Sequence, residues 1–109
     1  MNSPRAERAS ESAIEQWLNR QVKAAGGVSY KFVSPGNRGV PDRIYLLPGG
    51  DVWFVELKAE GGQRTALQEQ QARRIQKTGC RYRLITGMDE ARAFAREVIS
   101  AGTERGGGC

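Results

Sequence analysis

The sequence GVPD at residues 39–42, followed by VELK at residues 55–58, decides how this chain is interpreted. Asp42 begins a short apolar segment, and Glu56 lies two residues before Lys58 in the next one. A glycine turn between the segments makes them antiparallel neighbours, whose backbones lie about 4.8 Å apart. Asp42 and Glu56 then meet at one end of the pair, and Glu56 and Lys58 leave the same face. Such a group can hold a divalent metal beside a phosphate and activate a water.

A structural interpretation of the same residues stays open. Glu56 and Lys58 can form an ion pair on an exposed strand face, and Asp42 can be an ordinary turn residue after Pro41. Against this, Glu56 follows the apolar run VWFV at residues 52–55, where an unpaired charge is costly. The spacing therefore favours a functional site, although Asp…Glu-x-Lys also arises by chance.

The hydrophobic pattern predicts one α/β (α+β) domain with the order α-β-β-β-α-β-α, a mixed sheet flanked by helices. The nearly continuous apolar run at residues 52–59 predicts a central strand covered on both faces. We expect helices at residues 12–25, 65–77 and from 88 onward, and strands at residues 28–33, 42–47, 52–59 and 80–86. The domain is expected to span residues 11–101, between a flexible leader at residues 1–10 and a disordered glycine-rich tail at 102–109.

Composition narrows the chemistry further. The 109 residues include no histidine and two cysteines, Cys80 and Cys109, so histidine-based catalysis is excluded and a zinc site is implausible. Any metal would have oxygen ligands, which favours Mg²⁺ or Mn²⁺. The net charge of +5 favours a polyanionic partner, although a solvated basic surface explains it equally well. Without a membrane-length apolar stretch or signal peptide, we expect the cytoplasm of a bacterial or phage-infected host cell, with no membrane partner and no organic cofactor.

The motifs, taken in order, resemble the VRR-NUC family of PD-(D/E)XK nucleases over about residues 11–95. The residues that carry the resemblance are Ile14-Glu15, Gly26-Gly27, Tyr30-Lys31-Phe32, Gly39 to Arg43, Phe54 to Lys58, and Gln68. It implies a restriction-endonuclease-like αβββαβ core and a Mg²⁺- or Mn²⁺-dependent DNA endonuclease. The compact form is similar to stand-alone phage and bacterial members, which form homodimers and resemble Holliday junction resolvases. Cleavage of linear or flapped duplex, or DNA binding without catalysis, are the alternatives.

The resemblance also implies roles for particular residues. Asp42, Glu56 and the Leu57 backbone carbonyl would bind the metal together with Glu15, for which Glu11 is the alternative one helical turn earlier. Lys58 would be the catalytic lysine, acting with Asp42, Glu56 and Gln68. Gln68 has a competing structural role, because Thr65-x-x-Gln68 is also a capping-box sequence.

Basic and aromatic residues near these motifs are candidates for DNA contact. Tyr30, Lys31, Arg38 and Arg43 lie close to the metal-binding motifs in the sequence, and arginine suits phosphate, although any single one of the charged residues can equally be a plain surface charge. A second basic group follows around the second helix and the last strand, although it can equally be solubility charge. This group consists of Arg73, Arg74 and Lys77, with Arg81 and Arg83 beside them.

Overall fold

The computed structural model describes residues 8–100 and has the predicted order of elements. The expected tail and most of the expected leader lie outside these residues. The elements are α1 (Glu11–Ala24), β1 (Val28–Lys31), β2 (Arg43–Leu47), β3 (Asp51–Lys58), α2 (Ala66–Lys77), β4 (Arg81–Thr86) and α3 (Gly87–Phe94), which continues as a π-helical segment, Ala95–Ile99.

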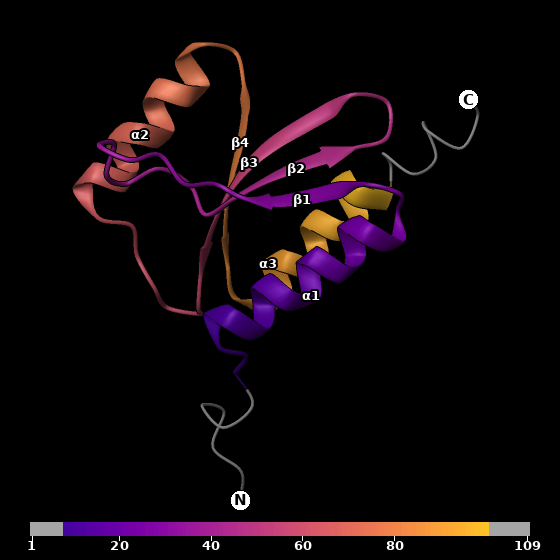
Figure 1. The fold of residues 1–109 in the computed structure, drawn as a ribbon. Helices are drawn as coiled ribbons and strands as arrows, with labels where there is room; N and C mark the ends of the chain where they lie inside the picture. The colour runs from indigo at the N-terminus through magenta and orange to yellow at the C-terminus, as the bar shows by residue number, and fades with distance from the viewer. Residues whose placement is uncertain (1–7, 101–109) are drawn as a thin grey trace, which may run out of the picture.

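The four strands form one mixed sheet in the order β1-β2-β3-β4. β1, β2 and β3 are antiparallel neighbours, whereas β4 runs parallel to β3. A parallel pair needs a crossover connection, and α2 provides it. α1 and α3 lie together on one face of the sheet, and α2 stands apart from them beside β4 (Figure 1).

The main core lies between the sheet and the pair α1–α3. Ile14, Leu18 and Val22, which share one side of α1, are fully buried. Phe94 of α3 is buried at the centre, with its ring 5.4 Å from that of Trp53 and 6.3 Å from that of Tyr45. This core fixes the position of the first turn of α1 relative to the ends of β2 and β3.

The second face of the sheet is only partly covered, which corrects the expectation that the central strand is buried on both faces. Glu56, toward the end of β3, is 1% exposed, but Val52 at its start is 40% exposed on the same face. Tyr30 of β1 is 59% exposed. The physical reason is that α2 packs mainly against β4, and its first turn reaches the end of β3 through the hydrogen bond from Gln68 to Glu56.

Several predicted boundaries move. β1 ends at Lys31 instead of Val33, although the Phe32 N–H still donates to the Asp42 carbonyl at 2.9 Å. β4 begins at Arg81, and Cys80 is an exposed free thiol. β3 spans Asp51–Lys58, one residue earlier at each end than expected.

α1 and α3 begin one residue earlier than predicted, whereas α2 begins one residue later, at Ala66. α1 starts at Glu11, because the Ser10 hydroxyl accepts a hydrogen bond from the Ala13 N–H at 3.0 Å and caps the helix. α3 starts at Gly87, whose φ of 84° allows the chain to turn directly from β4 into the helix. No helix within residues 8–100 has the length and hydropathy needed to span a membrane.

Candidate functional site

The structure brings Asp42 and Glu56 together at one end of the β2–β3 pair. Arg43 is the register partner of Val55, so the preceding residue, Asp42, lies opposite Glu56. The Asp42 Oδ2 atom accepts a hydrogen bond of 2.7 Å from the Leu57 N–H. This bond holds the Asp42 carboxylate against the end of β3.

Glu56 is a buried carboxyl group with a strongly shifted pKa. Burial raises the pKa of Glu56 to about 8, and the Asp42 carboxylate raises it through its charge and through a hydrogen bond between the two side chains. Lys58 acts in the opposite direction. Two carboxyl groups so close in a buried place favour a shared proton or a cation between them.

Gln68 forms the predicted capping box and also contacts the buried Glu56 carboxyl group. Its Oε1 atom accepts from the Thr65 N–H at 2.8 Å, and the Thr65 hydroxyl accepts from the Gln68 N–H, which completes the capping box. Its Nε2 atom donates to Glu56 Oε2 at 2.9 Å. The first turn of α2 is thereby attached directly to the buried carboxyl group.

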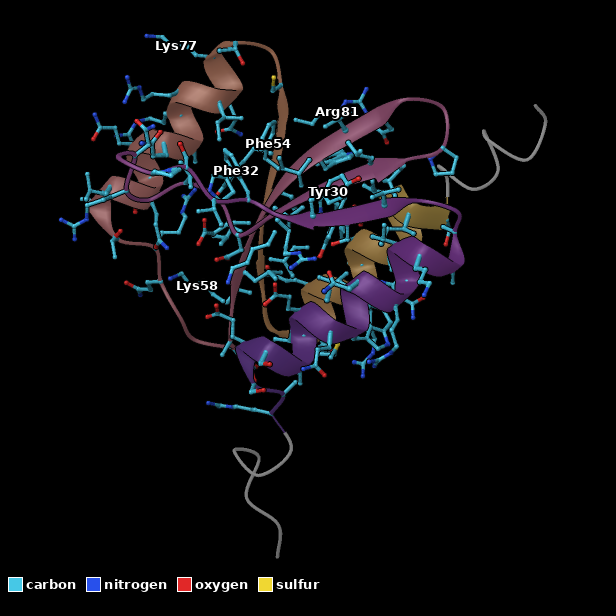
Figure 2. All side chains as sticks on the ribbon, viewed as in Figure 1. Tyr30, Phe32, Phe54, Lys58, Lys77 and Arg81 are labelled. Carbon is cyan, nitrogen blue, oxygen red and sulfur yellow. The ribbon has the colours of Figure 1, made fainter. Side chains whose placement is uncertain are left out.

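Lys58 projects from the same face of β3 as Glu56, at the end of the molecule where α1 begins (Figure 2). The turn that follows packs against its aliphatic part: a Cβ atom on Gly62 would lie 3.2 Å from the Lys58 Cβ. The Gly62 N–H donates to the Ala59 carbonyl at 2.9 Å and closes this turn. The turn therefore limits the orientations open to the lysine.

Glu15 is bound to Arg43, and this pair is part of a larger network between α1 and the sheet. Arg43 Nη1 donates to Glu15 Oε2 at 3.1 Å, while Arg43 Nε and Nη2 donate to the Ser29 hydroxyl at 3.1 and 2.8 Å. Ser29 donates in turn to Asn19 at 2.9 Å. The Arg43 side chain is only 14% exposed. Arg43, which we expected to contact a DNA phosphate, therefore faces the interior. The Glu15 carboxylate is already paired with the Arg43 guanidinium.

Glu11, the alternative acidic residue of α1, is exposed and lies one turn closer to the helix start. Partial burial raises the pKa of Glu11, and the Asp42 charge raises it further, whereas Lys58 lowers it. Glu11 is also among the charges that raise the pKa of Glu56. Its carboxylate is thus electrically coupled to the pair Asp42–Glu56.

The loop that carries Arg38 is packed onto the first turn of α2. Gly39 has a φ of 85°, and a Cβ atom there would lie 2.8 Å from the Leu67 carbonyl carbon and oxygen. Gln71 Nε2 donates to the Arg38 carbonyl at 3.1 Å. Arg38 itself is exposed beside α2, on the side of the sheet that carries Glu56.

The other DNA-contact candidates are dispersed. Tyr30 and Lys31 are both exposed but are consecutive strand residues, so they point to opposite faces of the sheet. Arg73, Arg74 and Lys77 are exposed on α2, and Lys77 lies at the end of α2 far from Lys58 (Figure 2).

The structure separates the two strand arginines from the basic group of α2. Arg81 binds Asp51 at 2.6 Å, and Arg83 lies 5.1 Å from the centre of the Phe94 ring of α3. Both therefore lie on the α3 face of the sheet. The predicted single basic group around α2 and β4 is wrong in this respect.

Two residues near the carboxyl pair were missed by sequence reasoning. Arg64 Nη1 donates to the Tyr82 hydroxyl at 3.2 Å, and its guanidinium lies 5.9 Å from the centre of the Tyr82 ring. Burial raises the pKa of Tyr82, and the charges of Glu56 and Asp42 raise it as well. The only signal in the sequence was the position of Arg64 directly before the Thr65 cap.

The available donors suit a hard cation that keeps much of its water. Within residues 8–100, no three Asp, Glu or Cys side chains lie close enough together to form a metal centre by themselves. Two adjacent carboxyl groups and the oxygen of a backbone carbonyl are the donor types that Mg²⁺ and Mn²⁺ prefer. Burial and, after it, the charge of Asp42 raise the pKa of Glu56, and a bound cation would relieve the repulsion between the two carboxylates.

The mixed sheet, with Asp42 directly before β2 and with Glu56 and Lys58 on β3, has a restriction-endonuclease-like fold. A solved VRR_NUC domain has the same fold, with a TM-score of 0.77 and 24% identity over 83% of this chain and 99% of that one. No family model matches the chain. A protein of Acyrthosiphon pisum secondary endosymbiont phage 1, named "Putative nuclease p44", is 43% identical over 79 residues, which cover 72% of this chain and 85% of the relative. The chain therefore belongs to the same nuclease family as this phage protein, and its fold is that of a VRR_NUC domain.

Proposed function

We propose that this chain is a Mg²⁺- or Mn²⁺-dependent DNA endonuclease that acts as a homodimer on branched DNA such as four-way junctions. The observation that carries the proposal is the buried Glu56 carboxyl group beside Asp42, held by Gln68 and followed on the same face by Lys58. The name and identity of the phage relative support nuclease activity. The preference for branched DNA and the dimer follow from the resemblance to stand-alone family members.

Asp42, Glu56 and the Leu57 backbone carbonyl would hold the metal. When bound, the metal supplies an activated water and positive charge at the phosphate. Asp42 accepts from the Leu57 N–H, Glu56 accepts from Gln68, and a hydrogen bond joins the two side chains, so both carboxyl groups are held in position. This arrangement reduces the reorganisation that binding requires.

The contribution of α1 comes from Glu11 or from Glu15. Arg43 already neutralises the charge of Glu15 by binding its Oε2 atom, whereas Glu11 is exposed and already coupled to Asp42. We propose that Glu11 faces the metal-bound waters and that Glu15 holds Arg43 and so fixes α1 on the sheet.

Lys58 places a positive charge beside the phosphate, where negative charge increases during the reaction. Hydrolysis adds the hydroxyl of water to phosphorus and returns a proton to the leaving 3′ oxygen. The products are a 5′-phosphate and a 3′-hydroxyl. Gln68 does not touch the phosphate in this proposal; it keeps Glu56 in position.

The test compares cleavage of a four-way junction, a flap and a linear duplex by the wild type, Glu56→Ala and Lys58→Ala, each with Mg²⁺ or Mn²⁺. Removing either residue should lower the cleavage rate by at least about 10²-fold. Gln68→Ala should have a smaller effect, on the order of 10- to 100-fold, as is typical of groups that hold a metal ligand. Arg92→Gln, which changes an exposed charge on α3 paired with Asp89, is the control.

Each substrate separates the proposal from an alternative. Preferred cutting of the junction supports the resolvase-like activity, whereas equal or better cutting of flap or linear duplex replaces it with a general duplex nuclease. Binding of all three DNAs with no cleavage in either metal would instead identify a DNA-binding module and remove the role of Lys58.

A further inference from the structure

Arg64 lies on the same face of the sheet as the carboxyl pair, on the side of β4. The β3–β4 register pairs Phe54 with Tyr82 and Glu56 with Leu84. Tyr82 is therefore on the face that carries Glu56, one pair of side chains away along the strands. Arg64, which precedes the N-cap of α2 and donates to the Tyr82 hydroxyl, is consequently held next to the site and not in free solvent.

The guanidinium of Arg64 has neutral partners. Ion pairs within residues 8–100 hold five other arginines, namely Arg8, Arg43, Arg81, Arg83 and Arg92, and none includes Arg64. A guanidinium has five N–H donors, and Tyr82 accepts from Nη1 of Arg64. The ring of Tyr82 orients the planar group without neutralising it.

Arg64 is held in a fixed orientation and forms no ion pair with a carboxylate within residues 8–100. It lies beside two carboxyl groups that are assigned to a metal. Its guanidinium is therefore suited to bind an anion. The anion that a nuclease brings to this place is the DNA backbone, and arginine can bind phosphate through two parallel hydrogen bonds. The scissile phosphate belongs at the carboxyl pair and Lys58. Arg64, displaced toward β4, would then reach the adjacent phosphate of the same strand.

We propose that Arg64 binds the DNA backbone phosphate next to the scissile phosphate, with Tyr82 as the residue that positions its guanidinium. The proposal rests on the nuclease function proposed above. Because backbone contacts position DNA and do not read its sequence, the loss of Arg64 should affect DNAs of different sequence equally.

The experiment measures binding of fluorescent four-way junction and linear duplex by anisotropy at several NaCl concentrations, with Ca²⁺ in place of Mg²⁺. The proteins are the wild type, Arg64→Gln, Arg64→Lys, Tyr82→Phe and the control Arg92→Gln, each checked for folding by circular dichroism. Arg64→Gln should weaken binding roughly 10- to 100-fold. It should also reduce the slope of log K against log salt by about 1.

The conservative variants distinguish a phosphate contact from a structural role. Arg64→Lys should keep the salt slope of the wild type and lose only part of the affinity, because it keeps the charge and loses the planar fork. Tyr82→Phe should keep the slope with a severalfold loss of affinity. If Arg64→Gln destabilises the protein, the slope and affinity of Arg64→Lys decide the question: values equal to those of Arg92→Gln overturn the proposal.

The proposal also falls if Arg64→Gln matches Arg92→Gln in affinity and slope. Cleavage by the wild type in Mg²⁺ separates this failure from that of the nuclease function. If the wild type cuts DNA and Arg64→Gln behaves like the control, the proposed nuclease function is supported and only the proposed role of Arg64 is wrong. A wild type that neither binds nor cuts DNA removes both.

Discussion

Glu56 is a buried carboxyl group beside the carboxyl group of Asp42. Its burial has a free-energy cost, which the neighbouring residues offset only in part. Gln68 supplies a neutral hydrogen bond, and Lys58 supplies the nearby opposite charge. Burial nevertheless raises the pKa of Glu56 to about 8. The free protein thus carries an electrostatic strain that a cation or a proton would remove, and this has a measurable consequence for stability.

The stability of the metal-free protein should fall as pH rises. The pKa of Glu56 increases from an ordinary value of 4.5 to about 8 on folding, so the folded state holds the proton more tightly. The contribution of this proton to the free energy of unfolding is fully present below about pH 4.5 and is lost as the pH rises through about 8. Thermal unfolding in EDTA should give a Tm that decreases across this range, and Glu56→Gln should flatten the decrease. An unchanged pH profile in the variant would contradict the prediction.

The two acidic residues of α1 should behave differently when each carboxylate is replaced. Glu11→Gln should weaken Mn²⁺ binding about tenfold, measured by isothermal titration, while leaving the Tm close to that of the wild type. Glu15→Gln should retain Mn²⁺ affinity but lose roughly 0.5–1 kcal/mol of stability, because it breaks a partly exposed ion pair with Arg43. The reverse pattern would identify Glu15 as the residue that faces the metal.

At the scale of elements, the geometry of the site depends on the first turn of α2. It carries the capping box, it reaches Glu56 through Gln68, and the loop at residues 34–41 packs on it. Close packing of that loop requires Gly39, because a side chain there would collide with the Leu67 backbone. A change in the loop should therefore move the helix end that holds the buried carboxyl group.

Gly39→Ala should destabilise the protein more than Gly36→Ala, which serves as a matched control. Both glycines have a positive φ, 85° and 82°, so each alanine has a conformational cost of about 1–2 kcal/mol. Only Gly39 also meets backbone atoms at 2.8 Å, whereas nothing lies within 4 Å of a Cβ at Gly36. Urea denaturation should show a further loss of about 1–3 kcal/mol for Gly39→Ala, together with slower DNA cleavage. Equal losses in the two variants would show that the contact does not matter.

At the scale of the whole molecule, residues 8–100 of one chain hold one candidate site, which would cut one strand at a time. Two copies related by a twofold axis would bring two sites to the symmetric strands of a junction. Sedimentation should therefore give twice the 12.0 kDa mass of one chain. Junction cutting should also rise more steeply than linearly with protein concentration below the dimer dissociation constant. A strictly monomeric protein that nevertheless cuts both strands in one binding event would contradict the dimer.

The sequence by itself determined the order of elements and the proximity of Asp42 and Glu56. Both depend on local properties: the apolar period of each segment, and a short turn after Leu47 that pairs this residue with Asp51 and so sets the register of β2 against β3. The strand register then places the two carboxylates opposite each other. The capping box of Thr65 and Gln68 is equally local and was visible in the sequence.

Only the tertiary structure decided which of these residues work together. The Glu56–Gln68 bond, the capture of Glu15 by Arg43, the Arg64–Tyr82 pair and the open half of the second sheet face all depend on where α1 and α2 pack. Packing is set by the fit of many side chains that are distant in the sequence, and no local period encodes it. For this reason the sequence pointed to Arg43 as a phosphate ligand, although the fold places it in a largely buried network, and gave no functional sign of Arg64.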